Sequence, residues 1–179
     1  SNTTGTGNTA VGQGAGLAIT TGGNNTIVGK LAGDAITTGG ANVAIGEDAL
    51  STATTVSNNT AVGQGAFEAN TSGEDGVAIG AAALSKNTTG NNNIAIGYQA
   101  LYDNTTGNYN TAIGWKSLFE NTTAASNVAI GYDSLRDNTT GATNTAIGVE
   151  ALANTTTADN NTAVCYNSLT ANTKGTLNT

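Results

Sequence analysis

The sequence of 179 residues contains no histidine, no proline and no methionine, and Cys165 is its single cysteine. A lone cysteine cannot form a disulfide within the chain, and the absence of histidine removes the commonest general base and metal ligand. Charged residues make up only 9% of the chain, with 12 acidic and 5 basic side chains. Because phosphate binding needs a basic face, we expect no nucleic-acid partner.

Long apolar runs are also missing. No segment approaches the roughly 18 apolar residues that cross a bilayer, and the opening residues SNTTGTGNTA do not resemble a signal peptide. We therefore expect no membrane insertion. The polarity that the chain does have comes mostly from asparagine and threonine, a composition commonest in extracellular proteins, which favours an extracellular location.

A glycine that closes a short apolar motif recurs at an interval of 17 residues. These marker glycines are Gly12, Gly29, Gly46, Gly63, Gly80, Gly97, Gly114, Gly131 and Gly148, and Cys165 takes the tenth place. A fixed period without insertions indicates one structural unit stacked many times. We number each coil from its first residue, usually Asn, as positions 1 to 17. The coils then begin at residues 8, 25, 42, 59, 76, 93, 110, 127, 144 and 161, and we expect one array over 1–179 without separate caps.

Each coil has two apolar points. Position 4 is always Val or Ile and position 2 is always Thr, Val or Ile, so this run predicts a short strand that the marker glycine ends. Position 9 is usually Leu after a small residue, which predicts a second short strand. The expected fold is all-β, a parallel β-solenoid (β-roll or β-helix) of ten 17-residue coils, about 48 Å long at the usual strand spacing.

The bulky apolar positions predict the core. We expect buried ladders of Ile96, Ile113, Ile130, Ile147, Leu101, Leu118, Leu135 and Leu152, so that Ile113→Asp would collapse the neighbouring coils. The small residues at positions 3 and 8 indicate close approach of another backbone, either across a thin coil or between chains. Asn at position 1 is expected to cap a turn. Because Cys165 is accepted at the marker position, that position is expected to have ordinary β geometry.

Units such as NIAIGYQAL (93–101) and NTAIGWKSL (110–118) resemble the head repeats of trimeric autotransporter adhesins. They are also similar to repeats of phage tail fibres and other bacterial surface fibres. The resemblance implies a left-handed β-roll, three chains side by side, and a fibre at a cell surface or on a virion that attaches to a host or matrix. The coil here is longer, with the extra residues in the NTTG turn.

Enzymatic function is not indicated. No acid recurs at a fixed place in the coil, and neither the six-residue repeat of acyltransferase solenoids nor a calcium-binding repeat is present. We expect no catalytic residues, no metal and no cofactor. The function expected is a non-enzymatic extracellular structural or adhesive fibre. Its main partner would be the chain itself, as a homotrimer or a head-to-tail filament, with glycans or a host surface as further partners. The alternatives are a solenoid that binds ice or carbohydrate, and a glycosylated filament subunit.

Two sets of residues are candidate sites. An aromatic edge at position 6 comprises Tyr98, Trp115, Tyr132 and Tyr166, interrupted by Val149, and serves either as a packing ladder or as a platform for a sugar or partner. The triplets NTT and NTS form a second set, either as turn residues or as N-glycosylation acceptors. Their asparagines are Asn2, Asn70, Asn87, Asn104, Asn121, Asn138 and Asn154. The adjacent threonines could order ice, although neighbours on a strand face opposite ways.

Overall fold

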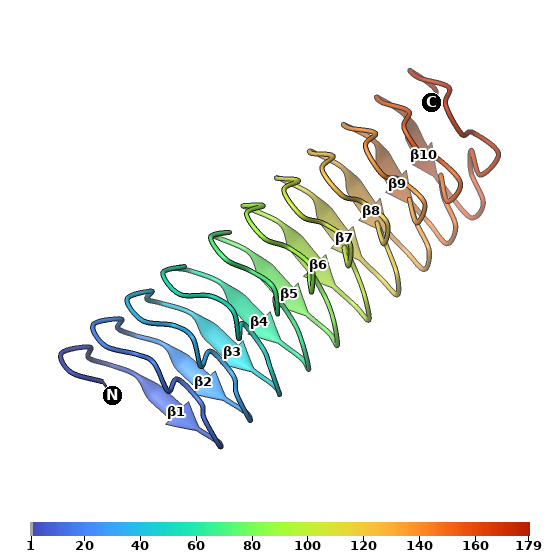
Figure 1. The fold of residues 1–179 in the computed structure, drawn as a ribbon. Helices are drawn as coiled ribbons and strands as arrows, with labels where there is room; N and C mark the ends of the chain where they lie inside the picture. The colour runs from blue at the N-terminus through green and yellow to red at the C-terminus, as the bar shows by residue number, and fades with distance from the viewer. Residues whose placement is uncertain (1) are drawn as a thin grey trace.

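The computed structural model describes residues 2–179 and winds them into a parallel β-solenoid, a rod with one strand per coil (Figure 1). Every strand pairs in parallel with the next, and each residue lies opposite the residue 17 positions further on, as Thr111 does with Val128. The all-β parallel solenoid predicted from the period is thus confirmed. The strands are β1 (Thr9–Val11), β2 (Thr26–Val28), β3 (Val43–Ile45), β4 (Thr60–Val62), β5 (Val77–Ile79), β6 (Ile94–Ile96), β7 (Thr111–Ile113), β8 (Val128–Ile130), β9 (Thr145–Ile147) and β10 (Thr162–Val164).

The second strand expected around position 9 is not formed, and that prediction was wrong. Positions 6 to 11 make a series of turns in which positions 7 and 9 have left-handed backbone, with φ of 52° at Gln99 and 53° at Leu101. A β-branched residue is strongly disfavoured at such angles. The sequence obeys this limit, because neither Val, Ile nor Thr occurs at position 7 or 9 in any coil.

The core is thinner than predicted and is built on the opposite face of the strand. Ala95 and Ala112 at position 3 are fully buried, whereas Ile96 at position 4 keeps 36% of its surface exposed. Ile113 and Ile130 are half-buried and Ile147 is exposed, so the isoleucines were wrongly assigned to the core. Alternation along a strand puts positions 2 and 4 on one side and position 3 on the other. The narrow interior takes Ala at position 3 in nine coils, and the buried Ile27 of the second coil lies beside Gly16 and Gly33, which stand where later coils have Leu or Phe. The leucines of position 9 are fully buried, as expected: Leu101, Leu118, Leu135 and Leu152.

Two asparagine ladders run inside the rod along its axis, perpendicular to the strands. At position 1, Asn110 Oδ1 accepts the backbone N–H of Asn127 at 3.0 Å, and Asn110 Nδ2 donates to the Ala124 carbonyl at 2.8 Å. At position 12, Asn104 Nδ2 donates to Asn87 Oδ1 at 2.7 Å and to the Gly107 carbonyl at 3.0 Å. These buried side chains therefore join successive coils as well as closing their own turn, and their burial is tolerated because their polar atoms are paired. Asn138 Oδ1 is the exception within the described part of these ladders, since the next coil has Thr155 in place of Asn.

The marker position does not have ordinary β geometry. Gly97, Gly114 and Gly131 have φ of 137°, 134° and 138°, in the region that favours glycine, so the prediction drawn from Cys165 was wrong. A β-carbon at Gly114 would also overlap the carbonyl oxygen of Gly131 in the next coil. Glycine is therefore needed both for the backbone angle and for the stacking distance.

The largest side chain of the core, Phe67, lies beside a glycine that replaces the usual asparagine in the next coil. Phe67 replaces Leu at position 9 and is 1% exposed, and Gly76 replaces Asn at position 1 of the following coil. A β-carbon on Gly76 would meet Phe67 Cζ at 2.5 Å. The glycine thus makes room for the aromatic ring at the cost of one rung of the position 1 ladder.

The left-handed backbone of position 9 leads to a test with two substitutions of similar volume. Leu118→Ile is expected to lower the free energy of unfolding by about 2–3 kcal/mol, because a β-branched side chain is strained at the φ of 52° found there. Leu118→Met keeps the unbranched β-carbon and should cost less than about 1.5 kcal/mol. Urea denaturation followed by circular dichroism measures both. Equal losses in the two variants would contradict the importance of this backbone angle.

Candidate functional site

The aromatic edge predicted at position 6 is present on the surface. The rings of Tyr98 and Trp115 stack with centroids 6.1 Å apart, and those of Trp115 and Tyr132 with centroids 4.8 Å apart and planes at 5°. Val149 follows in the next coil, before Tyr166, which is 72% exposed. The stacked rings are therefore Tyr98, Trp115 and Tyr132, which we call the aromatic row. It covers three of the ten coils, so this surface differs along the rod.

A second stack lies beside the aromatic row at position 10. Tyr102 and Phe119 stack with centroids 5.3 Å apart. Lys116 Nζ lies 4.6 Å from the Trp115 ring centroid and 5.0 Å from that of Phe119, and so links the two stacks by cation–π contacts. This second stack was not predicted as a site, although its two aromatic residues are 17 positions apart in the sequence.

Among the described residues, Lys30, Lys86 and Arg136 are paired with carboxylates, unlike Lys116. Lys86 donates a hydrogen bond to Asp103, which raises the pKa of Lys86, and Lys30 does the same with Glu47, which raises the pKa of Lys30. Arg136 pairs with Asp137 and Asp133, and the hydrogen bond to Asp137 is the main cause that raises the pKa of Arg136. Apart from Asp133, which is buried, the members of these pairs are exposed or partly exposed, and such surface pairs contribute little to stability.

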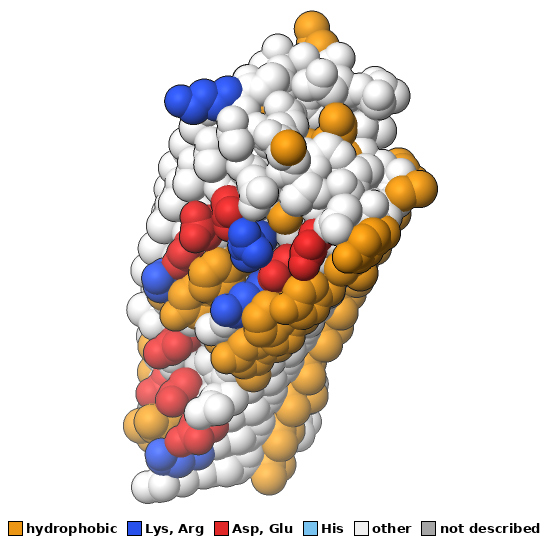
Figure 2. Space-filling model, turned by 90° about the vertical axis from the view of Figure 1, so that its right-hand side faces the viewer, with side chains coloured by type: hydrophobic (Ala, Val, Ile, Leu, Met, Phe, Trp, Pro, Cys, Tyr) orange, Lys and Arg blue, Asp and Glu red, His pale blue; other side chains and the backbone are white. Residues whose placement is uncertain are grey.

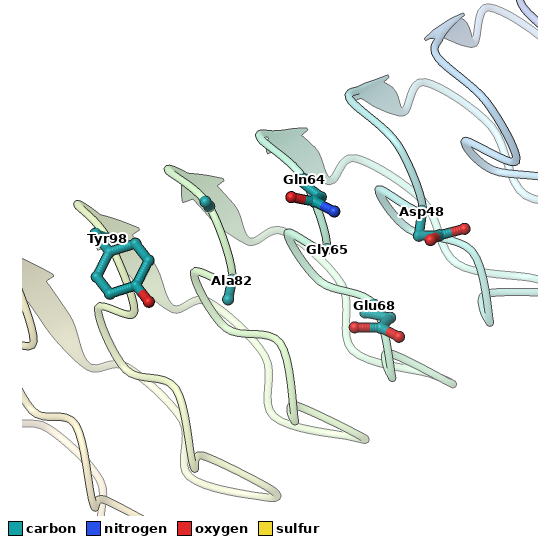
Figure 3. Close-up of a pocket in the computed structure, with 7 residues that line it drawn as sticks. Asp48, Gln64, Gly65, Glu68, Ala82 and Tyr98 are labelled. Carbon is teal, nitrogen blue, oxygen red and sulfur yellow. The ribbon is translucent and has the colours of Figure 1, made fainter.

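A hollow of about 370 Å³ opens at the end of the aromatic row (Figure 3). It exists because position 7 is small in two successive coils, at Gly65 and Ala82, and position 6 is small in the second, at Ala81, where neighbouring coils have longer side chains. Its lining residues are Asp48, Gln64, Gly65, Glu68, Ala81, Ala82 and Tyr98. It was not predicted from the sequence. The sequence signal for the hollow was the small size of Gly65 and Ala82 at position 7 and of Ala81 at position 6, where a later coil has Lys116 and Trp115.

The outward side chains of the strands form the outer sheet face, which we define as positions 2 and 4 of all coils. Each of these twenty residues is β-branched, uncharged, and exposed or half-buried. Figure 2 shows a row of hydrophobic side chains that follows one edge of the rod without a charged side chain in it. Position 4 runs Val11, Val28, Ile45, Val62, Ile79, Ile96, Ile113, Ile130, Ile147 and Val164, and position 2 runs Thr9, Thr26, Val43, Thr60, Val77, Ile94, Thr111, Val128, Thr145 and Thr162.

The asparagines of the NTT and NTS triplets are mostly inside the rod. Asn70, Asn87, Asn104, Asn121 and Asn138 are fully buried in the position 12 ladder, so they cannot accept a glycan in the folded chain, and their prediction as acceptors was wrong. Asn2 and Asn154 are exposed and keep that prediction. The five share the composition of a glycosylation motif because Asn is also the residue that forms hydrogen-bonded ladders.

The two threonines of these triplets have different roles. At position 13, Thr105 Oγ1 donates to the carbonyl of Thr122 in the next coil at 3.0 Å, and the same bond recurs from Thr122 to Thr139. At position 14 the side chains are exposed, as at Thr106 and Thr123. One row of hydroxyls is therefore held by the backbone and one faces solvent.

Within residues 2–179, no group of three or more His, Cys, Asp or Glu side chains is arranged to hold a metal ion. The same residues form no helix that is long and apolar enough to cross a membrane. Comparison of the chain with protein-family models, with curated proteins and with solved structures gave no match. Its function is therefore inferred from the surfaces described above.

Proposed function

We propose that the chain is a structural rod that associates side by side with further copies of itself through the outer sheet face, as a segment of an extracellular fibre. The observation that carries the proposal is the distribution of charge. The chain has 5 basic and 12 acidic residues, 17 in all, and every one of them lies outside positions 2 and 4. Twenty outward positions without a charge, on a chain that places charges on its other surfaces, favour a face that is covered.

The shape of the face favours a second copy as the partner. Its two rows of side chains are about 7 Å apart and run the length of the rod, about 48 Å, with one step per coil. A parallel copy repeats the same step, so β-branched side chains of one rod meet those of the other at every coil. The face alone is smaller than the roughly 800 Å² per partner of a standard stable interface. Flanking residues of the coil would therefore take part in the contact.

Fibre and extracellular use are part of the proposal. The rod is built of one coil repeated without insertion, and its asparagine and threonine side chains supply most of the polarity without charge. A length-setting spacer needs this uniformity and no catalytic centre. Adhesion to glycans or to a host surface would then come from local features of the rod. Labelling of intact cells or virions with an antibody to the array would test the location.

Ile113→Asp tests the association, since it places a charge at the centre of the outer sheet face. The parent chain is expected to sediment as a defined oligomer, and this variant as a monomer, because an unpaired charge buried in an interface costs about 3–5 kcal/mol. Ile113 is half-buried at the surface of a single rod, so the circular dichroism of the monomer should be unchanged.

The control is Thr106→Asp, which adds the same charge at an exposed residue of position 14, away from the outer sheet face. It should sediment like the parent. A parent chain that stays monomeric at high concentration would refute the proposal, and so would an oligomer that Ile113→Asp leaves intact.

A further inference from the structure

The hollow at the end of the aromatic row is where the regular surface of the rod is interrupted. Coil position 6 holds Tyr98, Trp115 and Tyr132 in three successive coils, but the coil before them has Ala81 there. Gly65 and Ala82 are equally small at position 7. Both changes leave the strands and the core untouched, because these residues project from the turn and not into the interior. The interruption is therefore a property of the surface alone.

One wall of the hollow is aromatic. The ring of Tyr98 has Trp115 as its stacking partner in the following coil, and only the methyl group of Ala81 stands at the same coil position on the other side. Tyr98 is 47% exposed and lines the hollow (Figure 3). An apolar ring surface is thus open to a ligand at this place, whereas Trp115 has a ring on both sides.

The rest of the lining is acidic. Asp48 and Glu68 supply two carboxylates, and Gln64 supplies an amide, with no Lys or Arg among the lining residues. The carboxylate of Glu68 lies across Gly65, since a β-carbon there would come within 3.2 Å of Glu68 Oε2, and Ser85 Oγ donates to the same oxygen at 3.4 Å. The nearby lysines are bonded elsewhere, Lys30 to Glu47 and Lys86 to Asp103. Within the part of the chain that the structure describes, neither Asp48 nor Glu68 forms a salt bridge, although Lys30 attracts Asp48 as well as Glu47, so both carboxylates can receive an external cation.

We propose that this hollow binds a single amino-bearing hexose unit, with its apolar ring face against Tyr98 and its ammonium group directed along the rod toward Glu68 and Asp48. Carboxylates attract an ammonium ion, and they also accept hydrogen bonds from sugar hydroxyls. The volume of about 370 Å³ lies at the lower end of the range for small-molecule sites and suits one ring. An anionic sugar would be repelled.

The experiment uses the full chain and follows the emission of Trp115, which is the only tryptophan and stacks on Tyr98. Glucosamine is the probe, compared with methyl glucoside and glucuronate, which carry the same type of ring with no charge and with a negative charge. Saturable binding of glucosamine is expected, about tenfold tighter than that of methyl glucoside and with none of glucuronate, since one charge-assisted contact is worth about that factor. Butylammonium tests the ring and should bind more weakly than glucosamine.

Two variants and one matched control locate the site. Ala81→Tyr continues the aromatic row into the hollow with a residue that three later coils carry at the same position, so the fold should persist while binding is lost. Glu68→Gln should weaken glucosamine about tenfold and leave methyl glucoside unchanged. Val149→Tyr installs the same side chain at position 6 away from the hollow and should bind as the parent does.

Each contrary result refutes a stated part of the proposal. Equal affinity of glucosamine for the parent and for Ala81→Tyr would show that the hollow is not the site. Equal affinity of methyl glucoside and glucosamine would refute the role of the carboxylates, and equal affinity of butylammonium would refute the sugar. A titration without saturation would refute the site as a whole. The proposed self-association depends on the outer sheet face and not on the hollow, so these variants should sediment like the parent. Sedimentation therefore tells a failure of the sugar proposal apart from a failure of the proposed association.

Discussion

Gly114→Cys is expected to unfold the middle of the array, lowering the free energy of unfolding by about 3–5 kcal/mol. The new β-carbon would overlap the carbonyl oxygen of Gly131, and the residue would have to keep a φ of 134° that is strained for any side chain. The overlap and the backbone strain both arise from the new β-carbon. Relieving either of them would move the next coil out of register. Urea denaturation monitored by circular dichroism measures the loss.

The same side chain is already present at Cys165, which gives the experiment a natural counterpart. Cys165 has a φ of 130°, so Cys165→Gly relieves backbone strain and should raise stability by up to about 1 kcal/mol. Thr106→Cys controls for the thiol at an exposed residue. A Gly114→Cys variant as stable as the parent would show that the coils can separate to admit a β-carbon.

Gly76→Asn is expected to destabilise the rod although it restores the commonest residue of position 1. Its β-carbon would meet Phe67 Cζ at 2.5 Å, and overpacking of this kind costs about 2–3 kcal/mol. In the double variant Phe67→Leu/Gly76→Asn the ring is gone, and the new amide can make the two inter-coil and intra-coil bonds seen at Asn110, each worth about 1 kcal/mol. The double variant should therefore be at least as stable as the parent.

A double-mutant cycle by chemical denaturation tests this compensation. The coupling between the two sites should be about 3 kcal/mol, at the upper end for residues in contact. Phe67→Leu alone is the third corner and should cost about 1 kcal/mol for the space it leaves. Additive effects of the two substitutions would show that Gly76 and Phe67 are independent.

The solenoid could be predicted because the period of 17 fixes which residues stack. The backbone conformation within one coil, and which side chains face its interior, were harder to predict. Position 4 shows why. Hydrophobicity alone placed Ile96 and its equivalents inside, but the coil is so thin that the interior takes Ala95, and the isoleucines lie outside. Position 9 was assigned to a strand because Leu recurs there. Positions 7 and 9 lack β-branched residues, which suits their left-handed backbone, but positions 1 and 8 lack them too, so this absence alone did not identify that backbone.

Surface features that recur every 17 residues could be predicted from the sequence, and those that do not recur could not. Tyr98, Trp115 and Tyr132 stand 17 residues apart, so their stacking followed from the period. The hollow beside them depends on what is missing from two coils, which a search for recurring residues does not register. The NTT motif misled for a different reason. Asn104 and its equivalents have the sequence of an exposed acceptor, and only their direction in the coil places them in the buried ladder.

Pairing of each residue with the one 17 positions away also determines how such a rod can change over generations. Every strand pairs only with the coil before and the coil after it. An in-frame duplication or loss of one whole repeat therefore alters the length by about 4.8 Å and leaves all other contacts as they were. A shift by any other number of residues would turn ladders and glycines out of register at once. The length of the rod can thus be selected in steps of one coil, independently of the side chains that its surface displays.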